Sequence, residues 1–182
     1  ISADGVADHQ PAKLAAYEGH YDKSAPADMY LFGWVDDNKQ EVTGVKIPGF
    51  LSFLVHWDFN EPVKGLNAFP EDERPDAVNA VFQFYHLMIA IGMLMIVLTL
   101  YASFRWYQGK LFNDRRLLWV FVFAILLPMF ANQVGWFAAE MGRQPWVVYG
   151  LLRTSDALSQ SVTANHVWFS LIMFAVIYLL LF

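Results

Sequence analysis

The sequence predicts an all-α membrane protein, a transmembrane helix bundle with three spans in this chain, preceded by an irregular extracytoplasmic N-terminal loop segment. Three observations predict this class. Hydrophobic residues make up 57% of the chain and charged residues only 16%, a higher apolar share than soluble domains have. Three apolar stretches are each long enough to cross a hydrocarbon core, which takes about 20 residues. The acidic residues concentrate before residue 75, where 13 Asp and Glu outnumber 6 Lys and Arg.

Residues 1–74 are predicted to form one acidic segment outside the membrane. Strand-like runs at Met29–Val35 and Glu41–Ile47 lie between turn signals, and Lys13–Tyr21 predicts a short helix. The rest of the segment shows only weak periodicity. Its aromatic residues, Trp34 and Trp57 among them, argue against disorder.

Residues 75–182 contain the predicted spans, at about 77–104, 116–139 and 162–182. Asp76 follows a proline and is predicted to cap the free amides at the start of the first span. Pro128 lacks a backbone donor, so it predicts a kink near the middle of the second span.

The loop between the first two spans predicts the orientation of the chain. It carries four basic residues and a single acid, Asp114, and short basic loops face the cytoplasm. Residues 1–74 and the region around Glu140 are therefore expected on the opposite side.

The end of the second span carries the first candidate site. Gln133, Trp136 and Glu140 are spaced i, i+3 and i+7, so they share a helix face that Arg143 would continue. A charge at membrane depth is costly and marks a functional site by default. Glu140 could ligate a metal or haem iron, with Trp136 against a ring system and Arg143 holding carboxylates. The alternative is a Glu140–Arg143 pair that reaches the interface, with Trp136 as an interfacial residue.

The first span carries the second candidate. Tyr85, Met88 and Gly92 share one face, where a thioether can bind iron and a glycine lets a flat macrocycle approach. The alternative is that Met88 simply fills a gap between helices. His86 lies about 200° around the helix from Met88, so the two cannot both ligate one iron from this helix. As a lone histidine, His86 is expected to be a hydrogen-bonded interface residue.

Several functional classes find no support in the sequence. It has no cysteine, which excludes disulfides, iron–sulfur clusters and thiolate ligands. It has no phosphate-binding glycine loop, no nucleophile elbow and no basic patch for nucleic acid. The chain opens on Ile1 and stops at Phe182 within an apolar run, so we expect a piece of a longer polypeptide.

The stretch Gly135–Trp146, followed by Leu152–Ala157, resembles the C-terminal half of subunit I of the cytochrome bd-type quinol oxidases. Gln10–Glu18 resembles the start of the quinol-binding loop of that family. Three shorter pieces resemble later landmarks of that loop: Leu31-Phe32-Gly33, Ile47-Pro48 and Val63-Lys64-Gly65-Leu66. The loop then passes directly into Phe84–Met88, as in members with the short form of the loop.

The resemblance implies a haem enzyme that oxidises quinol near the outer membrane face and reduces O2 to water. Met88 matches the axial methionine of a low-spin haem b, and Glu140 matches a carboxylate ligand in the di-haem oxygen-reducing site. Trp136 matches an aromatic bridge between haems, and Arg143 matches a residue near haem propionates. The implied cofactors are the low-spin haem b, a high-spin haem b and haem d, or a further haem b in place of haem d.

On the quinol side, Lys13 and Glu18 match residues implicated in quinol binding and oxidation, the acid being a natural proton acceptor. His86 is a departure, because many members have arginine at this position. The resemblance places His86 among the residues near the low-spin haem. We expect a lower or more pH-dependent potential for that haem, which a redox titration of His86→Arg would check.

The resemblance also implies partners and location. They are membrane lipid, quinol, O2, the missing N-terminal half with its histidine ligands, a second integral membrane subunit and a small accessory subunit, but no nucleic acid. The implied location is the bacterial cytoplasmic membrane, crossed several times. Two alternatives stay open: a non-catalytic membrane subunit or transporter in which Glu140 and Arg143 form a structural pair or proton relay, and a quinone-binding anchor that feeds other enzymes.

Overall fold

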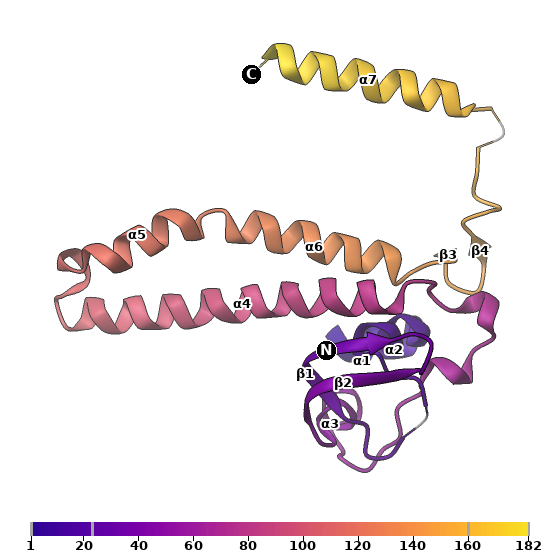
Figure 1. The fold of residues 1–182 in the computed structure, drawn as a ribbon, viewed down its shortest axis with the longest axis horizontal. Helices are drawn as coiled ribbons and strands as arrows, with labels where there is room; N and C mark the ends of the chain where they lie inside the picture. Colours follow the sequence, from indigo (N-terminus) through magenta and orange to yellow (C-terminus); the bar gives the residue numbers. More distant parts are fainter. Residues whose placement is uncertain (1, 23, 160, 182) are drawn as a thin grey trace.

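The computed structural model describes residues 2–22, 24–159 and 161–181 (Figure 1). The N-terminal segment contains three short helices, two 3-10 turns and one antiparallel hairpin. Their bounds are α1 Ser2–His9, α2 Pro11–Glu18, β1 Met29–Asp36, β2 Glu41–Ile47, α3 Phe50–His56, η1 Leu66–Ala68 and η2 Glu71–Glu73. The predicted strands are confirmed, as is a short helix near residue 13. The helices α1 and α3 were not predicted, because both are too short to show a clear period.

The remaining residues form long helices with one short hairpin. Their bounds are α4 Val78–Tyr107, η3 Leu111–Asn113, α5 Arg115–Ala124, α6 Leu127–Met141, β3 Trp146–Val148, β4 Leu152–Arg153 and α7 Ala164–Leu181. Three stretches are long and apolar enough to cross a membrane, with mean hydropathies of 2.3, 2.0 and 1.9 in chain order. The predicted fold class, a helical membrane protein with three spans, is therefore confirmed.

The predicted cap on the first span is wrong. Helix α4 begins at Val78 with Ala77 as its N-cap residue, and no side chain caps it. Asp76 is exposed and stands one residue too early, and a side chain caps a helix from the N-cap position itself. Asp114 does occupy that position at α5, where its Oδ1 accepts a hydrogen bond of 3.2 Å from the Leu117 amide.

The predicted kink in the second span is confirmed. Helix α5 ends at Ala124 and α6 begins at Leu127, so the span consists of two consecutive helices. Pro128 lies in the first turn of α6, where its missing amide leaves no hydrogen bond unmade.

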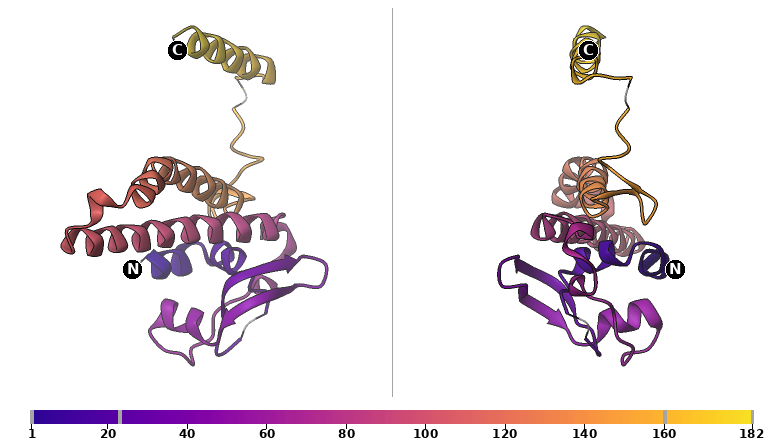
Figure 2. Two further views of the ribbon diagram at one scale, coloured as in Figure 1. Left: turned by 60° about the vertical axis from the view of Figure 1, so that its left-hand side comes forward. Right: turned by 90° about the vertical axis from the view of Figure 1, so that its right-hand side faces the viewer.

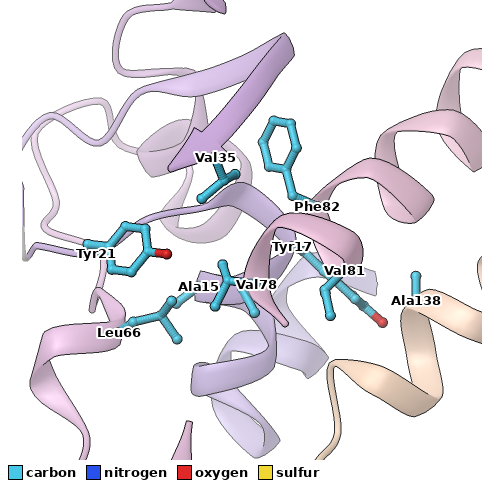
Figure 3. Close-up of a cluster of buried hydrophobic side chains, with 10 residues drawn as sticks. Ala15, Tyr17, Tyr21, Val35, Leu66, Val78, Val81, Phe82 and Ala138 are labelled. Carbon is cyan, nitrogen blue, oxygen red and sulfur yellow. The ribbon is translucent and has the colours of Figure 1, made fainter. Parts of the chain in front are cut away.

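Helix α6 returns along α4, and the N-terminal segment packs against the first half of α4 (Figures 1 and 2). The three parts share one hydrophobic core, shown in Figure 3, to which Tyr17 contributes from α2, Val81 and Phe82 from α4, and Ala138 from α6. Val81 and Phe82 are completely buried. The acidic segment, the start of α4 and the end of α6 therefore form one packed unit.

The C-terminal helix α7 differs from the other spans. None of its described residues is buried, and the helix stands apart from the remaining elements in Figure 1. A helix that is apolar on all sides is stable only inside lipid or against further protein.

Candidate functional site at the junction of α2, α4 and α6

Helix α2 ends in a way that fixes the position of Glu18. Its first turn contains Pro11, and Gly19 caps its C-terminus in the left-handed conformation, with φ of 61°. A Cβ on Gly19 would lie only 2.7 Å from Val42 Cγ2 and 3.0 Å from Val35 Cγ2. Glycine is therefore needed here both for the backbone conformation and for the close approach of the hairpin.

Glu18 is the last residue of α2 and is only 3% exposed. Its Oε2 atom is buried and has no hydrogen-bond partner among the described residues. Burial disfavours the charged carboxylate and raises the pKa of Glu18 to about 8. The structure thus holds an unpartnered acid that is neutral at pH 7 and takes up a proton readily once ionised.

Aromatic stacking joins α2 to α4. The rings of Tyr17 and Tyr85 stack with centroids 4.2 Å apart and planes within 4°. Lys13 Nζ also contacts the Tyr17 ring, at 5.7 Å from its centroid, a cation–π distance. Burial raises the pKa of Tyr17 to about 12, so its hydroxyl stays protonated. Tyr85 is three residues before Met88, so the stack ends about one turn from that residue.

The structure also brings Lys13 to the end of α6. Lys13 lines a narrow crevice together with Arg143, Gln144 and Trp146. Burial and the charge of Arg143 lower the pKa of Lys13, while the nearby Glu140 acts in the opposite direction. The sequence-predicted quinol residue and the sequence-predicted haem residues thus share one junction.

Glu140 and Arg143 form an ion pair, with side chains 37% and 32% exposed respectively. The Arg143 Nε atom is buried and has no partner among the described residues. Trp136 is 56% exposed on α6. The face predicted from the sequence is therefore accessible, and both interpretations of Glu140, as a metal ligand or as half of a structural pair, stay predictions.

Met88 packs between α4 and α6. A Cβ on Gly135 would overlap the Met88 sulfur, so the thioether fills the notch that this glycine leaves on α6. Next to it on α4, a Cβ on Gly92 would meet no atom within 4 Å. The space at Gly92 suits the approach of a flat ring, and the Met88 sulfur, which lies against Gly135, would reach an iron there in another rotamer of this flexible side chain. The residues present are compatible with haem.

His86 is buried on the side of α4 that faces the hairpin. Its Nε2 lies 2.7 Å from the Tyr30 carbonyl oxygen of β1, and its Nδ1 lies 2.9 Å from that of Phe82. The expected hydrogen-bonded histidine is confirmed. Its assignment to the haem-binding residues stays a prediction.

Two further polar residues of the same helix, Asn79 and Gln83, contact the hairpin and were not predicted from the sequence. They stand four residues apart near the start of a largely apolar helix, and His86 follows three residues later. A search for polar residues on one helical face would have found this row.

The fold and the site define a class of protein: an integral membrane protein whose spans pack against a segment that presents a buried acid. The family follows from sequence comparison. The chain matches the family described as cytochrome bd terminal oxidase subunit I over residues 1–182, and it belongs to that family.

Similar proteins cover almost all of this chain. It is 32% identical to a Bacillus subtilis cytochrome bd ubiquinol oxidase subunit 1 and 34% identical to a putative cytochrome bd menaquinol oxidase subunit I of that organism, in each case over 100% of this chain. It is 27% identical to an Escherichia coli cytochrome bd-II ubiquinol oxidase subunit 1, over 98% of this chain. That alignment extends over 245 positions, so the relative carries extra residues within the matched region.

A solved structure shows the same fold. The bd oxidase from Geobacillus thermodenitrificans matches 99% of this chain with a TM-score of 0.78 and 33% sequence identity, over 41% of that chain. The chain spans 41%, 42% and 48% of the three curated relatives. It therefore corresponds to less than half of each.

Proposed function

We propose that this chain is part of a terminal respiratory oxidase that oxidises membrane quinol and reduces O2 to water. Two quinols supply four electrons and four protons for each O2, giving two quinones and two waters. The proposal follows from the family and from one observation in particular. The buried Glu18 carboxyl, whose Oε2 has no partner among the described residues, follows Tyr17 on α2, and Tyr17 shares a core with Ala138 and Met141, which flank Glu140 on α6.

Glu18 is proposed to take a proton from quinol at Oε2. A quinol hydroxyl loses its proton as the ring is oxidised, and a base with a pKa near the working pH is well suited to accept it. The pKa of Glu18, about 8, is close to that range. Lys13 is proposed to hold a quinol oxygen by donating from Nζ, since this ammonium lies at the edge of the same junction.

Met88 and Glu140 are proposed to hold haem iron, with Trp136 beside the rings and Arg143 near their carboxylates. When bound, the haems supply one-electron redox chemistry and a place for O2 to react. The open space at Gly92 and the partly exposed Glu140 face support this assignment. The proposed set is a low-spin haem b, a high-spin haem b and haem d or a further haem b.

The proposed location is the bacterial cytoplasmic membrane, with residues 1–74 on the extracytoplasmic side. The proposed partners are the remainder of the same subunit, a second integral membrane subunit, a small accessory subunit and the surrounding lipid. The unburied surface of α7 supports the presence of such neighbours.

A second candidate is a non-catalytic membrane subunit in which Glu140 and Arg143 form a structural pair. The ion pair between these residues favours it. In that case Glu140 replacement would disturb packing and leave no spectroscopic trace.

The test uses the complete oxidase purified from membranes. We expect reduced-minus-oxidised spectra with haem bands, and O2 consumption on addition of quinol. Loss of the oxygen-site signal in Glu140→Ala, with the low-spin signal retained, would support the ligand assignment. A preparation without haem bands, or a spectrum unchanged in both Met88→Ala and Glu140→Ala, would favour the structural candidate.

A further inference from the structure

Three polar side chains of α4 bind the backbone of β1. They stand at i, i+4 and i+7, so they form one row along the helix. Each of the three side chains contacts a backbone group of β1. Asn79 Oδ1 accepts a hydrogen bond of 3.2 Å from the Val35 amide, and Gln83 Nε2 donates one of 2.7 Å to the Gly33 carbonyl oxygen. His86 Nε2 lies 2.7 Å from the Tyr30 carbonyl oxygen.

The row is internally connected. Gln83 Nε2 also donates to Asn79 Oδ1 at 3.3 Å, so the two amides support each other. In the two-stranded sheet, β1 pairs with β2 along one edge only. A free edge exposes unpaired amides and carbonyls that need cover. Here the side chains of a predicted membrane span provide partners for the other edge of the strand.

The hairpin in turn contacts the end of α2. Gly19 lies so close to Val35 and Val42 that a Cβ on it would be 3.0 Å and 2.7 Å from their methyl carbons. The same Cβ would lie 3.4 Å from the Phe82 ring of α4. Gly19 is therefore enclosed by the hairpin and α4, and it is bonded directly to Glu18. A shift of the hairpin along α4 would move the peptide that holds the Glu18 carboxyl.

The packing and the hydrogen bonds have different roles in this arrangement. Val35, Val42 and Phe82 belong to or pack against the shared core, and apolar contact of this kind is not directional. Hydrogen bonds are directional and weaken steeply when misaligned. The three polar side chains therefore define where along α4 the strand sits.

We propose that Asn79, Gln83 and His86 are positioning residues for quinol oxidation. They dock the β1–β2 hairpin on α4 at one register and thereby hold Glu18 where quinol meets it. This inference rests on the proposed function, and it adds to the proposed site a row of residues that acts through the hairpin.

The test replaces Gln83 by Met in the complete oxidase. Methionine keeps the length of the side chain and removes the donor to Gly33. Gln83 is five residues from Met88, more than one helical turn, so the change leaves that residue in place. We expect the KM for quinol to rise about 3- to 10-fold, as for the loss of one buried hydrogen bond. The rate with an artificial donor that reduces the enzyme directly, and the low-spin haem spectrum, stay unchanged.

A second readout does not depend on activity. In Asn79→Leu the Val35 amide loses its acceptor, so hydrogen exchange of a peptide covering 29–36 becomes faster. The matched control is Gln108→Met, because Gln108 is an exposed amide at the opposite end of α4. The control should change neither the KM for quinol nor the exchange of that peptide.

Each outcome decides the proposal. Faster exchange in Asn79→Leu together with a raised KM for quinol in Gln83→Met supports it. Faster exchange with an unchanged KM overturns it, because the row would then dock the hairpin without positioning the quinol site. Unchanged exchange, or equal loss of activity with both donors, overturns it as well. A wild-type enzyme that oxidises no quinol would refute the proposed function, and the exchange experiment would still report whether the row docks the hairpin.

Discussion

The two carboxyl groups near the junction of α2, α4 and α6 have opposite environments. Glu18 belongs to the polar N-terminal segment and is buried, and its Oε2 has no hydrogen-bond partner in the part of the chain that the structure describes. Glu140 belongs to an apolar span, yet it is paired with Arg143 and remains 37% exposed. Glu18 comes from the polar part of the sequence and is buried, whereas Glu140 comes from an apolar part and is partly exposed.

This difference shows that hydropathy and burial report on different things. Hydropathy indicates which helices suit lipid, whereas burial depends on which elements meet in the folded chain. A buried acid with a raised pKa suits reversible proton transfer. A partly exposed acid with a basic neighbour suits contact with a bound group.

Replacing Glu140 by Ala is expected to abolish O2 consumption by the complete oxidase while the low-spin haem spectrum survives. The reason is that the proposed ligand is lost and Met88 is untouched. An oxygen electrode and redox difference spectra measure the two properties. Glu41→Ala is the control, because Glu41 is an exposed glutamate on β2. Full turnover in Glu140→Ala would break the comparison, since the accessible acid would then have no catalytic role.

Replacing Glu18 by Gln is expected to lower quinol oxidation by about 100-fold, the usual contribution of a general base. The amide keeps the size of the neutral carboxyl, so the fold is preserved. The rate with an artificial donor should survive. Equal losses with both donors would indicate damage to folding, and the buried acid would lose its proposed role.

The same variant tests the pH dependence. With a pKa of about 8, Glu18 becomes ionised as the pH rises toward 8, so the rate of quinol oxidation in the wild type should rise between about pH 6 and pH 8. In the unfolded chain the carboxyl has its ordinary pKa of 4.5, so between these values the native state binds more protons and stability falls as the pH rises. The part of each slope that Glu18 contributes should be absent in Glu18→Gln, as rate profiles and thermal midpoints would show.

Replacing Lys13 by Ala is expected to raise the KM for quinol about 10-fold, as for the loss of one charge-assisted hydrogen bond. The rate with an artificial donor should not change. Steady-state kinetics over a range of quinol concentrations measures the effect. Lys39→Ala serves as the control, since Lys39 lies in the exposed hairpin turn. A fall in turnover with an unchanged KM would place Lys13 outside the binding step.

The smallest effect is expected at the ion pair between Asp72 and Arg153. Its two side chains are 65% and 36% exposed, and solvent screens such pairs. Asp72→Asn should leave the thermal midpoint and the quinol oxidation rate unchanged within error. This result would strengthen the contrast. The Glu140–Arg143 pair is also a carboxylate–guanidinium pair, so any effect of its loss would come from its position at the proposed haem site.

The sequence was informative where a pattern is local. The hairpin strands, the spans and the break before Pro128 follow from periodicity and backbone chemistry, and all three are present. Asp76 failed as a cap because the exact start of a helix depends on the contacts around it. The helices α1 and α3 were missed because short elements are stabilised by packing, as Leu51 and Val55 of α3 are in a second buried cluster.

Composition and spacing act along the chain, so they were enough to predict a membrane protein, the positions of its spans and the residue types that could bind iron or quinol. The burial of Glu18, the approach of Lys13 to the end of α6 and the binding of β1 by a polar row on α4 depend on the folded chain. These relations join residues up to about 130 positions apart, and they exist only once α2, α4 and α6 have packed together.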